Sequence, residues 1–213
     1  MTLNKTSFIE LAIRKNVLKF GDFLTKAGRK SPYFFNLGAF DDGDSLKLLG
    51  QFYANIIIEK NINFDMLYGP AYKGIPLVST IAIALAEQGL NIPYCFNRKE
   101  EKDHGEGGII IGAPINGNVL IIDDVISAGT SVNESNQLIK ANGGIPVGVF
   151  VAIDRQEKGS HGLTATEEAS RNLKLPVHSI ISLIDIVSYL DQSNLYKDEL
   201  AKIQEFQKVF GVI

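Results

Sequence analysis

The chain has 213 residues, of which 45% are hydrophobic, so it can bury a full core, and we expect residues 1–213 to form a single domain. It has no apolar run long enough to cross a bilayer, and its first ten residues, MTLNKTSFIE, lack the apolar segment of a secretory signal, which predicts a cytoplasmic protein with no membrane partner. The net charge of −3 argues against a nucleic-acid partner, and the single cysteine, Cys95, excludes an internal disulfide and a metal site built from several cysteines.

The first sixty residues predict two helices separated by extended chain. The segment SFIELAIRKN has a helical pattern, with Ser7 and Glu10 at the spacing of a capping box. Asp44 can cap a second, longer helix that runs to about Glu59. Between the helices, extended segments are expected at residues 17–23 and 32–37, joined by the basic loop TKAGRKS.

From residue 64 onward, short apolar runs alternate with helical patterns. We expect strands at residues 64–68, 92–96, 119–122 and 147–153, and helices at residues 74–88, 130–141 and 197–210. This alternation is typical of an α/β protein with a central, mostly parallel sheet that is covered by helices on both faces.

Two polar segments interrupt the alternation. The first, NRKEEKDHGEGG at residues 97–108, has seven charged side chains and three glycines and almost no apolar residue to anchor it. It is predicted to be a mobile excursion from the body of the protein. The second, DRQEKGSHGLTATEE at residues 154–168, is also polar and leaves the end of a predicted strand.

The stretch VLIIDDVISAGTS, residues 119–131, combines a buried strand, two carboxylates and the start of a helix. Free amides at a helix start, together with hydroxyls and a glycine, favour a phosphate group. The carboxylates of Asp123 and Asp124 would repel that phosphate, so we expect them to face sugar hydroxyls or a bridging cation. A ribose phosphate satisfies both halves; the alternative is two surface acids beside a helix cap. The fingerprints GxxxxGK[ST] and GxGxxG are absent.

This stretch resembles the phosphoribosyl pyrophosphate (PRPP) motif of the type I phosphoribosyltransferases, in which an apolar run and two acids precede a small-residue loop that ends in Gly-Thr. The resemblance implies that family's fold, with a small hood formed by about residues 1–40 and a lid loop at about residues 97–108. It also implies that PRPP contacts Asp123, Asp124, Val125, Ile126, Ser127, Ala128, Gly129, Thr130 and Ser131. Ser127 departs from the threonine common in relatives but keeps the hydroxyl.

The loop GPAYKGIP, residues 69–76, corresponds to the family's pyrophosphate loop. Tyr72 and Lys73 match its binding positions, and the family often has a cis non-proline peptide here, which we expect near Ala71 and Tyr72. Lys73 stands just ahead of a helix, where a compact cation can meet an anion. The alternative for Lys73 is a solvated lysine at a helix start.

The charged segment at residues 97–108 has two interpretations. By itself it is typical of a solvated loop. Beside a site that releases pyrophosphate, it predicts a lid that neutralises charge and excludes water. Its PRPP-binding groups would then be Arg98, Lys99, Lys102 and His104. His104 could act as an acid or only bind.

The segment TKAGRKSPYFFNLG, together with the three motifs above, resembles the bacterial members of this family that use orotate, over nearly the whole chain. The resemblance implies that Lys26 contacts PRPP, that Phe34, Phe35 and Ser127 line the orotate pocket, and that Arg155 meets orotate. An arginine suits the orotate carboxylate. Alternation along an extended segment means that one of the two phenylalanines faces the ligand with its side chain. The alternatives are core packing for the phenylalanines and a surface pair of Asp154 with Arg155.

The resemblance implies transfer of the 5-phosphoribosyl group from PRPP to orotate, which gives orotidine 5'-phosphate and pyrophosphate in the synthesis of UMP. No protein nucleophile is needed, so catalysis should be mostly electrostatic and positional. The catalytic groups would be Lys73, Lys102, His104, Asp123 and Asp124. Mg²⁺ would be held mainly by PRPP, with no direct protein ligand expected. Family members are homodimers in which each lid reaches the neighbouring subunit's site.

Two rival functions remain open. A purine phosphoribosyltransferase would keep the fold, but the segment from Lys26 to Asn36 together with Arg155 suits an anionic pyrimidine. A nucleotide-sensing regulator that binds nucleic acid would need a basic surface outside the lid, and the remaining charge is balanced or acidic.

Overall fold

The structure is a computed structural model that describes the whole chain except residues 1, 26–27, 103–107, 128, 160–161 and 213 and the side chains of residues 101 and 102. Its central element is a six-stranded sheet with the strand order β5-β4-β3-β6-β7-β8. The strands are β3 (Met66–Gly69), β4 (Tyr94–Lys102), β5 (Gly108–Gly112), β6 (Asn118–Ile122), β7 (Ile145–Asp154) and β8 (Val177–Ser182). Strands β4 and β5 pair antiparallel and the other neighbours pair parallel, which confirms the mostly parallel sheet.

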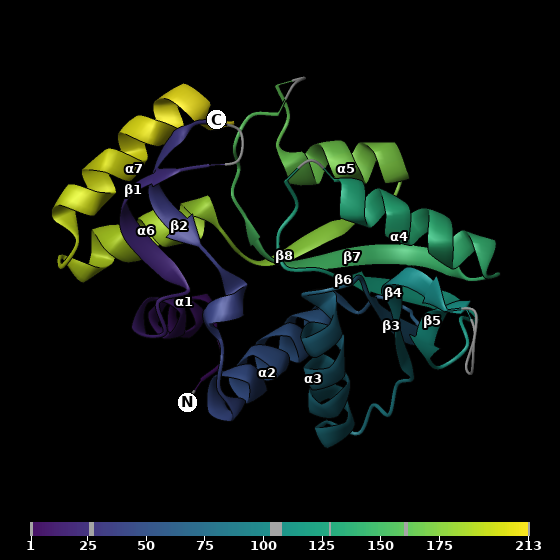
Figure 1. Cartoon of the computed structure of the whole chain (residues 1–213). Coiled ribbons are helices and arrows are strands. Elements are labelled where there is room, and N and C mark those ends of the chain that lie inside the picture. The colour runs from purple at the N-terminus through teal and green to yellow at the C-terminus, as the bar shows by residue number, and fades with distance from the viewer. Residues whose placement is uncertain (1, 26–27, 103–107, 128, 160–161, 213) are drawn as a thin grey trace.

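Helices cover both faces of this sheet, as predicted. Helices α2 (Gly43–Lys60) and α3 (Gly74–Glu87) lie on one face, and α4 (Thr130–Ala141) and α5 (Ala165–Leu173) lie on the other (Figure 1). Strand β6 shows why the central strands are apolar throughout. Leu120 and Ile122 pack in the core cluster with α2 and α3, whereas Val119 and Ile121 pack in the cluster with α4 and α5.

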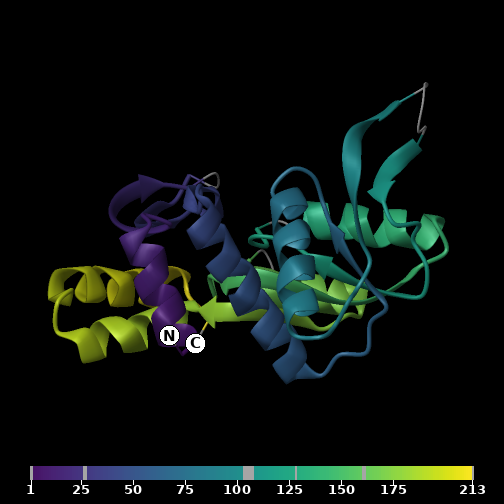
Figure 2. The same ribbon diagram turned by 90° about the horizontal axis from the view of Figure 1, so that it is seen from below.

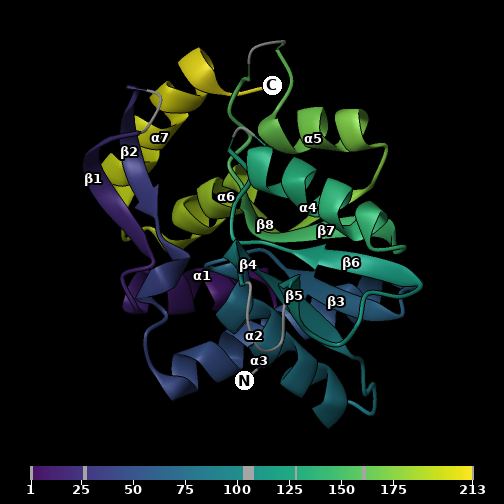
Figure 3. The same cartoon turned by 45° about the vertical axis from the view of Figure 1, so that its right-hand side comes forward.

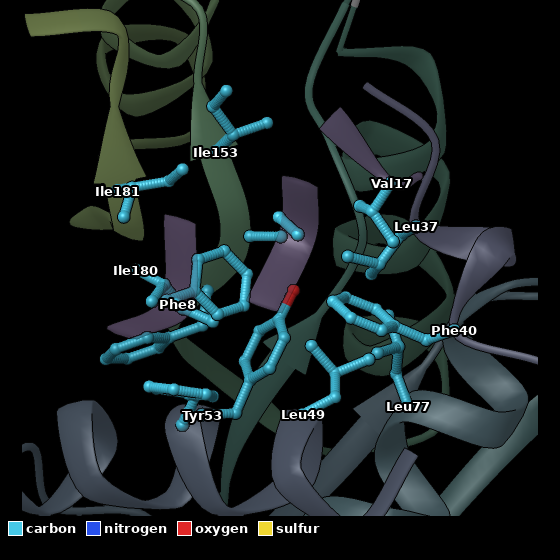
Figure 4. Packing of buried hydrophobic residues seen from close by; sticks show 14 of the residues in the cluster. Phe8, Val17, Leu37, Phe40, Leu49, Tyr53, Leu77, Ile153, Ile180 and Ile181 are labelled. Carbon is cyan, nitrogen blue, oxygen red and sulfur yellow. The ribbon is translucent and has the colours of Figure 1, made fainter. Parts of the chain in front are cut away.

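The larger core cluster joins distant parts of the chain. Figure 4 shows Phe8 of helix α1 (Lys5–Arg14) packed with Tyr53 of α2 and with side chains of β7 and β8. The ring of Phe8 lies edge-on to that of Phe52, with centroids 5.0 Å apart. The N-terminal helix is therefore fixed against the sheet by apolar burial.

The N-terminal region also forms a two-stranded antiparallel ribbon, made of β1 (Leu18–Leu24) and β2 (Lys30–Phe35). The ribbon lies beside the C-terminal helix α7 (Lys197–Phe210) (Figures 1 and 3). Tyr33 of β2 meets Phe206 of α7 edge-on, with ring centroids 6.2 Å apart. Helix α6 (Leu183–Ser193) lies beside α7 and packs against α1. The two ends of the chain thus build one layer beside the sheet.

Two predicted helix starts are wrong by a few residues. Helix α1 is capped by Asn4, whose side chain accepts from the backbone of Ser7, and Ser7 takes the reciprocal position of the capping box instead of the cap itself. Helix α2 is capped by Asp42 instead of Asp44, and Asp44 lies in its first turn. The chain has two side chains of capping type within one turn at each of these helix starts, so spacing alone does not decide which of them is the cap.

The polar segment from residue 97 also differs from the prediction. The chain stays in strand β4 through Lys102, and Asn97 pairs with Ile110 of β5 in an antiparallel hairpin that projects from the body (Figure 2). Backbone hydrogen bonds between two strands do not require apolar side chains, so the polar composition of residues 97–102 did not indicate that β4 continues through Lys102. Among the described residues, no helix is both long enough and apolar enough to cross a membrane.

Gly69 at the end of β3 provides a test of this packing. An added Cβ would meet the carbonyl oxygen of Gly74 and lie 2.8 Å from Cβ of Val78. Gly69→Ala should therefore lower the free energy of unfolding by about 1–3 kcal/mol in urea denaturation. Gly43→Ala is the matched control, since an added Cβ there meets nothing within 4 Å. Equal stability of the two variants would contradict the packing described for Gly69.

Candidate active site

The strand order reverses at the centre of the sheet. From β3 the chain passes through α3 to its neighbour β4, and from β6 it passes through α4 to its neighbour on the other side, β7. The loops after β3 and β6 therefore leave adjacent strand ends toward opposite faces of the sheet. In open α/β sheets this crevice is where ligands bind.

Two carboxylates follow β6 at this crevice. Asp123 is buried; its Oδ1 accepts from the amide of Asp124 at 2.9 Å, and its carbonyl oxygen accepts from the hydroxyl of Tyr53 at 2.9 Å. Burial, reinforced by the charge of Asp124, raises the pKa of Asp123 to about 6. Asp124 is paired across the crevice with Lys73, whose Nζ lies 2.6 Å from Oδ2. The ion pair joins the two loops that flank the strand reversal.

The loop after the carboxylates leads directly into α4. Ile126 is buried, whereas Ser127, Thr130 and Ser131 are exposed. Gly129, in the left-handed region at φ +72°, takes the cap position of α4 and provides no side-chain cap. Within the described part of the chain, no side chain caps the amides of the first turn, which suits an anion. Val125 forms a bridge with Ile153 of β7, and Ala128 lies outside the described residues.

The loop after β3 has the predicted cis peptide, between Ala71 and Tyr72. Tyr72 is 71% exposed, and Nζ of Lys99 lies 5.9 Å from its ring centroid. Asn97 at the root of the hairpin accepts from the amide of Ala71 at 2.8 Å. Asn97 was not predicted from the sequence, because only the pairing of β3 with β4 brings its side chain to this loop.

A cavity of about 700 Å³ lies between this loop, the hairpin and α4, and its lining follows α4 from Thr130 to Ala141. Its lining includes Pro70, Ala71, Arg98, Lys99, Thr130 and Ser131. Two of the four predicted lid cations, Arg98 and Lys99, therefore line this cavity, which borders the loop after β3. The backbone of Lys102 belongs to β4, but its side chain and all of His104 lie outside the described part of the chain.

Three residues predicted for orotate lie on β2 and just after β7, and the fourth, Ser127, lies in the loop between β6 and α4. Phe35 is buried in the larger core cluster, whereas Phe34 is 42% exposed and stacks on Phe23 with ring centroids 5.4 Å apart. The expected alternation is therefore observed. Arg155 pairs with Glu157 and does not form the surface pair with Asp154 that we considered as an alternative. Lys26 lies outside the described residues.

The raised pKa of Asp123 predicts a pH-dependent stability. Its carboxyl keeps its proton to about pH 6 in the folded chain but ionises near pH 4 when unfolded, so stability falls as pH rises through this window. Asp123→Asn removes the ionisation. From pH 4 to pH 8 the free energy of unfolding of the variant should therefore gain up to about 3 kcal/mol relative to the parent protein in ligand-free denaturation.

The matched control is Asp191→Asn, which removes an exposed carboxylate on α6. Its free energy of unfolding should follow that of the parent protein at every pH. A constant difference between Asp123→Asn and the parent protein across this range would contradict the raised pKa.

Known proteins share this arrangement. Residues 38–165 match the family model of the phosphoribosyl transferase domain. The orotate phosphoribosyltransferase of Nitrosospira multiformis is 57% identical over 203 residues, which cover 95% of this chain and 89% of the relative. That of Neisseria meningitidis serogroup C is 52% identical over the full length of both chains. The crystal structure of orotate phosphoribosyltransferase from Francisella tularensis is 40% identical, with a TM-score of 0.87 over 96% of this chain and 99% of that one. The chain therefore belongs to the orotate phosphoribosyltransferases, within the type I phosphoribosyltransferase fold.

Proposed function

We propose that the protein transfers the 5-phosphoribosyl group of PRPP to orotate and releases orotidine 5'-phosphate and pyrophosphate, in pyrimidine biosynthesis. The observation that carries the proposal is the ion pair of Lys73 with Asp124 across the strand reversal, next to a helix start without a side-chain cap. One crevice thereby contains a cation that suits pyrophosphate, carboxylates that suit sugar hydroxyls and amides that suit a phosphate.

PRPP fits this crevice in one orientation. Its 5'-phosphate would accept from the amides and hydroxyls of the loop from Val125 to Ser131, and its ribose hydroxyls would donate to Asp123 and Asp124. Lys73 would leave Asp124 and pair with the pyrophosphate instead, because a compact ammonium pairs readily with phosphate oxygens. Tyr72 lies in the same loop as Lys73, and Lys99 of β4 lies over its ring; both would contact the pyrophosphate from the hairpin side.

The reaction breaks the bond between the anomeric carbon and the pyrophosphate oxygen and forms a bond from that carbon to a ring nitrogen of orotate, which gives up its proton. Positive charge grows on the ribose and negative charge on the leaving group. Asp123 and Asp124 would stabilise the positive charge. Lys73 would stabilise the negative charge, together with Arg98, Lys99 and Lys102 of β4 and with His104. Positioning and electrostatics account for catalysis without a covalent intermediate.

Orotate would bind between the ribbon and the end of β7. The exposed ring of Phe34 offers a face for the pyrimidine, whereas the buried Phe35 would contribute through its backbone. Arg155 would pair with the carboxylate of orotate, and Ser127 would close the pocket from the PRPP loop.

We propose Mg²⁺ as the cofactor. Adjacent carboxylates beside a phosphate site suit a hard cation, and Mg²⁺ prefers oxygen ligands while keeping several waters. Asp124, whose side chain is 16% exposed, would accept hydrogen bonds from those waters, with the phosphates of PRPP as the direct ligands. The ion would supply neutralisation of the pyrophosphate charge.

The assay that tests this function follows orotate absorbance and pyrophosphate release with PRPP and Mg²⁺. Orotate should be consumed in equal amount to the pyrophosphate released, since one bond replaces the other, and chelation of the metal should stop the reaction. Hypoxanthine, adenine and uracil serve as control acceptors. Turnover of any of these in place of orotate would contradict the proposal.

We further propose that two copies of the chain share their active sites, each hairpin reaching into its neighbour's site. Mixing Lys102→Ala with Asp124→Asn would then rebuild one intact site in each hybrid dimer, and random pairing should restore about a quarter of the parent activity. Steady-state assay of the refolded mixture measures this. A mixture no more active than the mean of the two variants would contradict sharing.

A further inference from the structure

The turn that follows β7 is held in place by parts of the chain distant in sequence. Gln156, at φ +50°, donates its amide to Asp154 at 2.9 Å, and its side-chain oxygen accepts from the amide of Ile184 at 2.9 Å. Its carbonyl accepts from Val212 at 3.0 Å. The amide of Lys158 donates to Phe210 at 2.7 Å in the same C-terminal tail, so the turn is fixed before any substrate binds.

Glu157 is the centre of a partly buried network on this turn. Its Oε1 accepts from Arg155 at Nε, 2.8 Å away, and at Nη2, 2.5 Å away. The same oxygen accepts from the hydroxyl of Tyr33 at 3.2 Å. Arg29 approaches its Oε2 at 3.9 Å. The side chains of Arg155 and Glu157 are only 19% and 16% exposed, so solvent screens their pairing weakly.

Tyr33 completes the support of Arg155. The guanidinium carbon lies 4.6 Å from the centroid of the Tyr33 ring, and Nη2 reaches Oγ of Ser31 at 3.4 Å. Burial raises the pKa of Tyr33 well above its usual range, so the phenol stays protonated and donates to Glu157. Nη1 of Arg155 has no hydrogen-bond partner among the described residues, which leaves one arm of the fork for a ligand.

We propose that Glu157 is a positioning residue for the acceptor substrate: it holds Nε and Nη2 of Arg155 against the Tyr33 ring so that Nη1 points to the carboxylate of orotate. This rests on the proposed function, in which Arg155 binds that carboxylate. An arginine that is fixed in advance loses less rotamer freedom on binding than a mobile one. The C-terminal tail takes part, because it fixes the backbone from which Glu157 projects.

The experiment compares Glu157→Ala, Glu157→Gln and the control Glu205→Gln with the parent protein, in steady-state kinetics with orotate and PRPP varied separately. Glu205 is an exposed acid on α7 outside the network. Glu157→Ala should raise the KM for orotate by about tenfold to a hundredfold, as expected for a misplaced binding group. The KM for PRPP should stay within about twofold. Glu157→Gln, whose amide oxygen can still accept from Arg155 but carries no negative charge, should raise the orotate KM less than Glu157→Ala.

Two results would overturn the assignment. One is an orotate KM of Glu157→Ala within about twofold of the parent value; the other is an equal rise of both KM values, which indicates general loss of structure. Thermal unfolding of each variant, with Glu157→Gln as the milder change, identifies a folding defect. A parent protein that fails to use orotate refutes the proposed function itself, whereas an active parent with an unaffected Glu157→Ala refutes the positioning role alone.

Discussion

The reversal of strand order between β3 and β6 is the constraint on which the site depends. Because the chain turns to opposite sides after these neighbouring strands, the loops that leave them separate and open a crevice at their carboxyl ends. One loop brings Lys73 and the other brings Asp124, and their ion pair spans the opening. The apolar strands beneath, buried on both faces, keep the two loops in fixed relation.

The charged and polar groups at the crevice are complementary to those of a sugar phosphate. Burial and the charge of Asp124 raise the pKa of Asp123 to about 6, and the ammonium of Lys73 neutralises Asp124. The helix start beside them lacks a side-chain acceptor. A phosphate would accept hydrogen bonds from these amides, and sugar hydroxyls would donate to the carboxylates. A sugar phosphate therefore matches both features. On the orotate side of the site, Glu157 likewise holds the charged group of Arg155 in place for a substrate of opposite charge.

Local patterns predicted the parts of the structure that depend on local chemistry. The apolar strands, the helix of residues 130–141 and the acids after β6 follow from burial and helix periodicity, and the resemblance supplied the cis peptide at Ala71. The partners of Ala71 and Arg155 did not follow from the sequence. Asn97 reaches Ala71 through the pairing of β3 with β4. Glu157 lies only two residues from Arg155, but it folds back onto Arg155 in a turn whose backbone is bonded to the C-terminal tail. Neighbouring capping candidates likewise left the helix starts undecided.

The most direct test of the account is a crystal structure of the protein with PRPP and Mg²⁺. We expect the 5'-phosphate within hydrogen-bond distance of the amides from Ser127 to Ser131 and the ribose hydroxyls on Asp123 and Asp124, with Lys73 moved from Asp124 to the pyrophosphate. Donor density elsewhere, or aspartates turned away from the sugar, would contradict it.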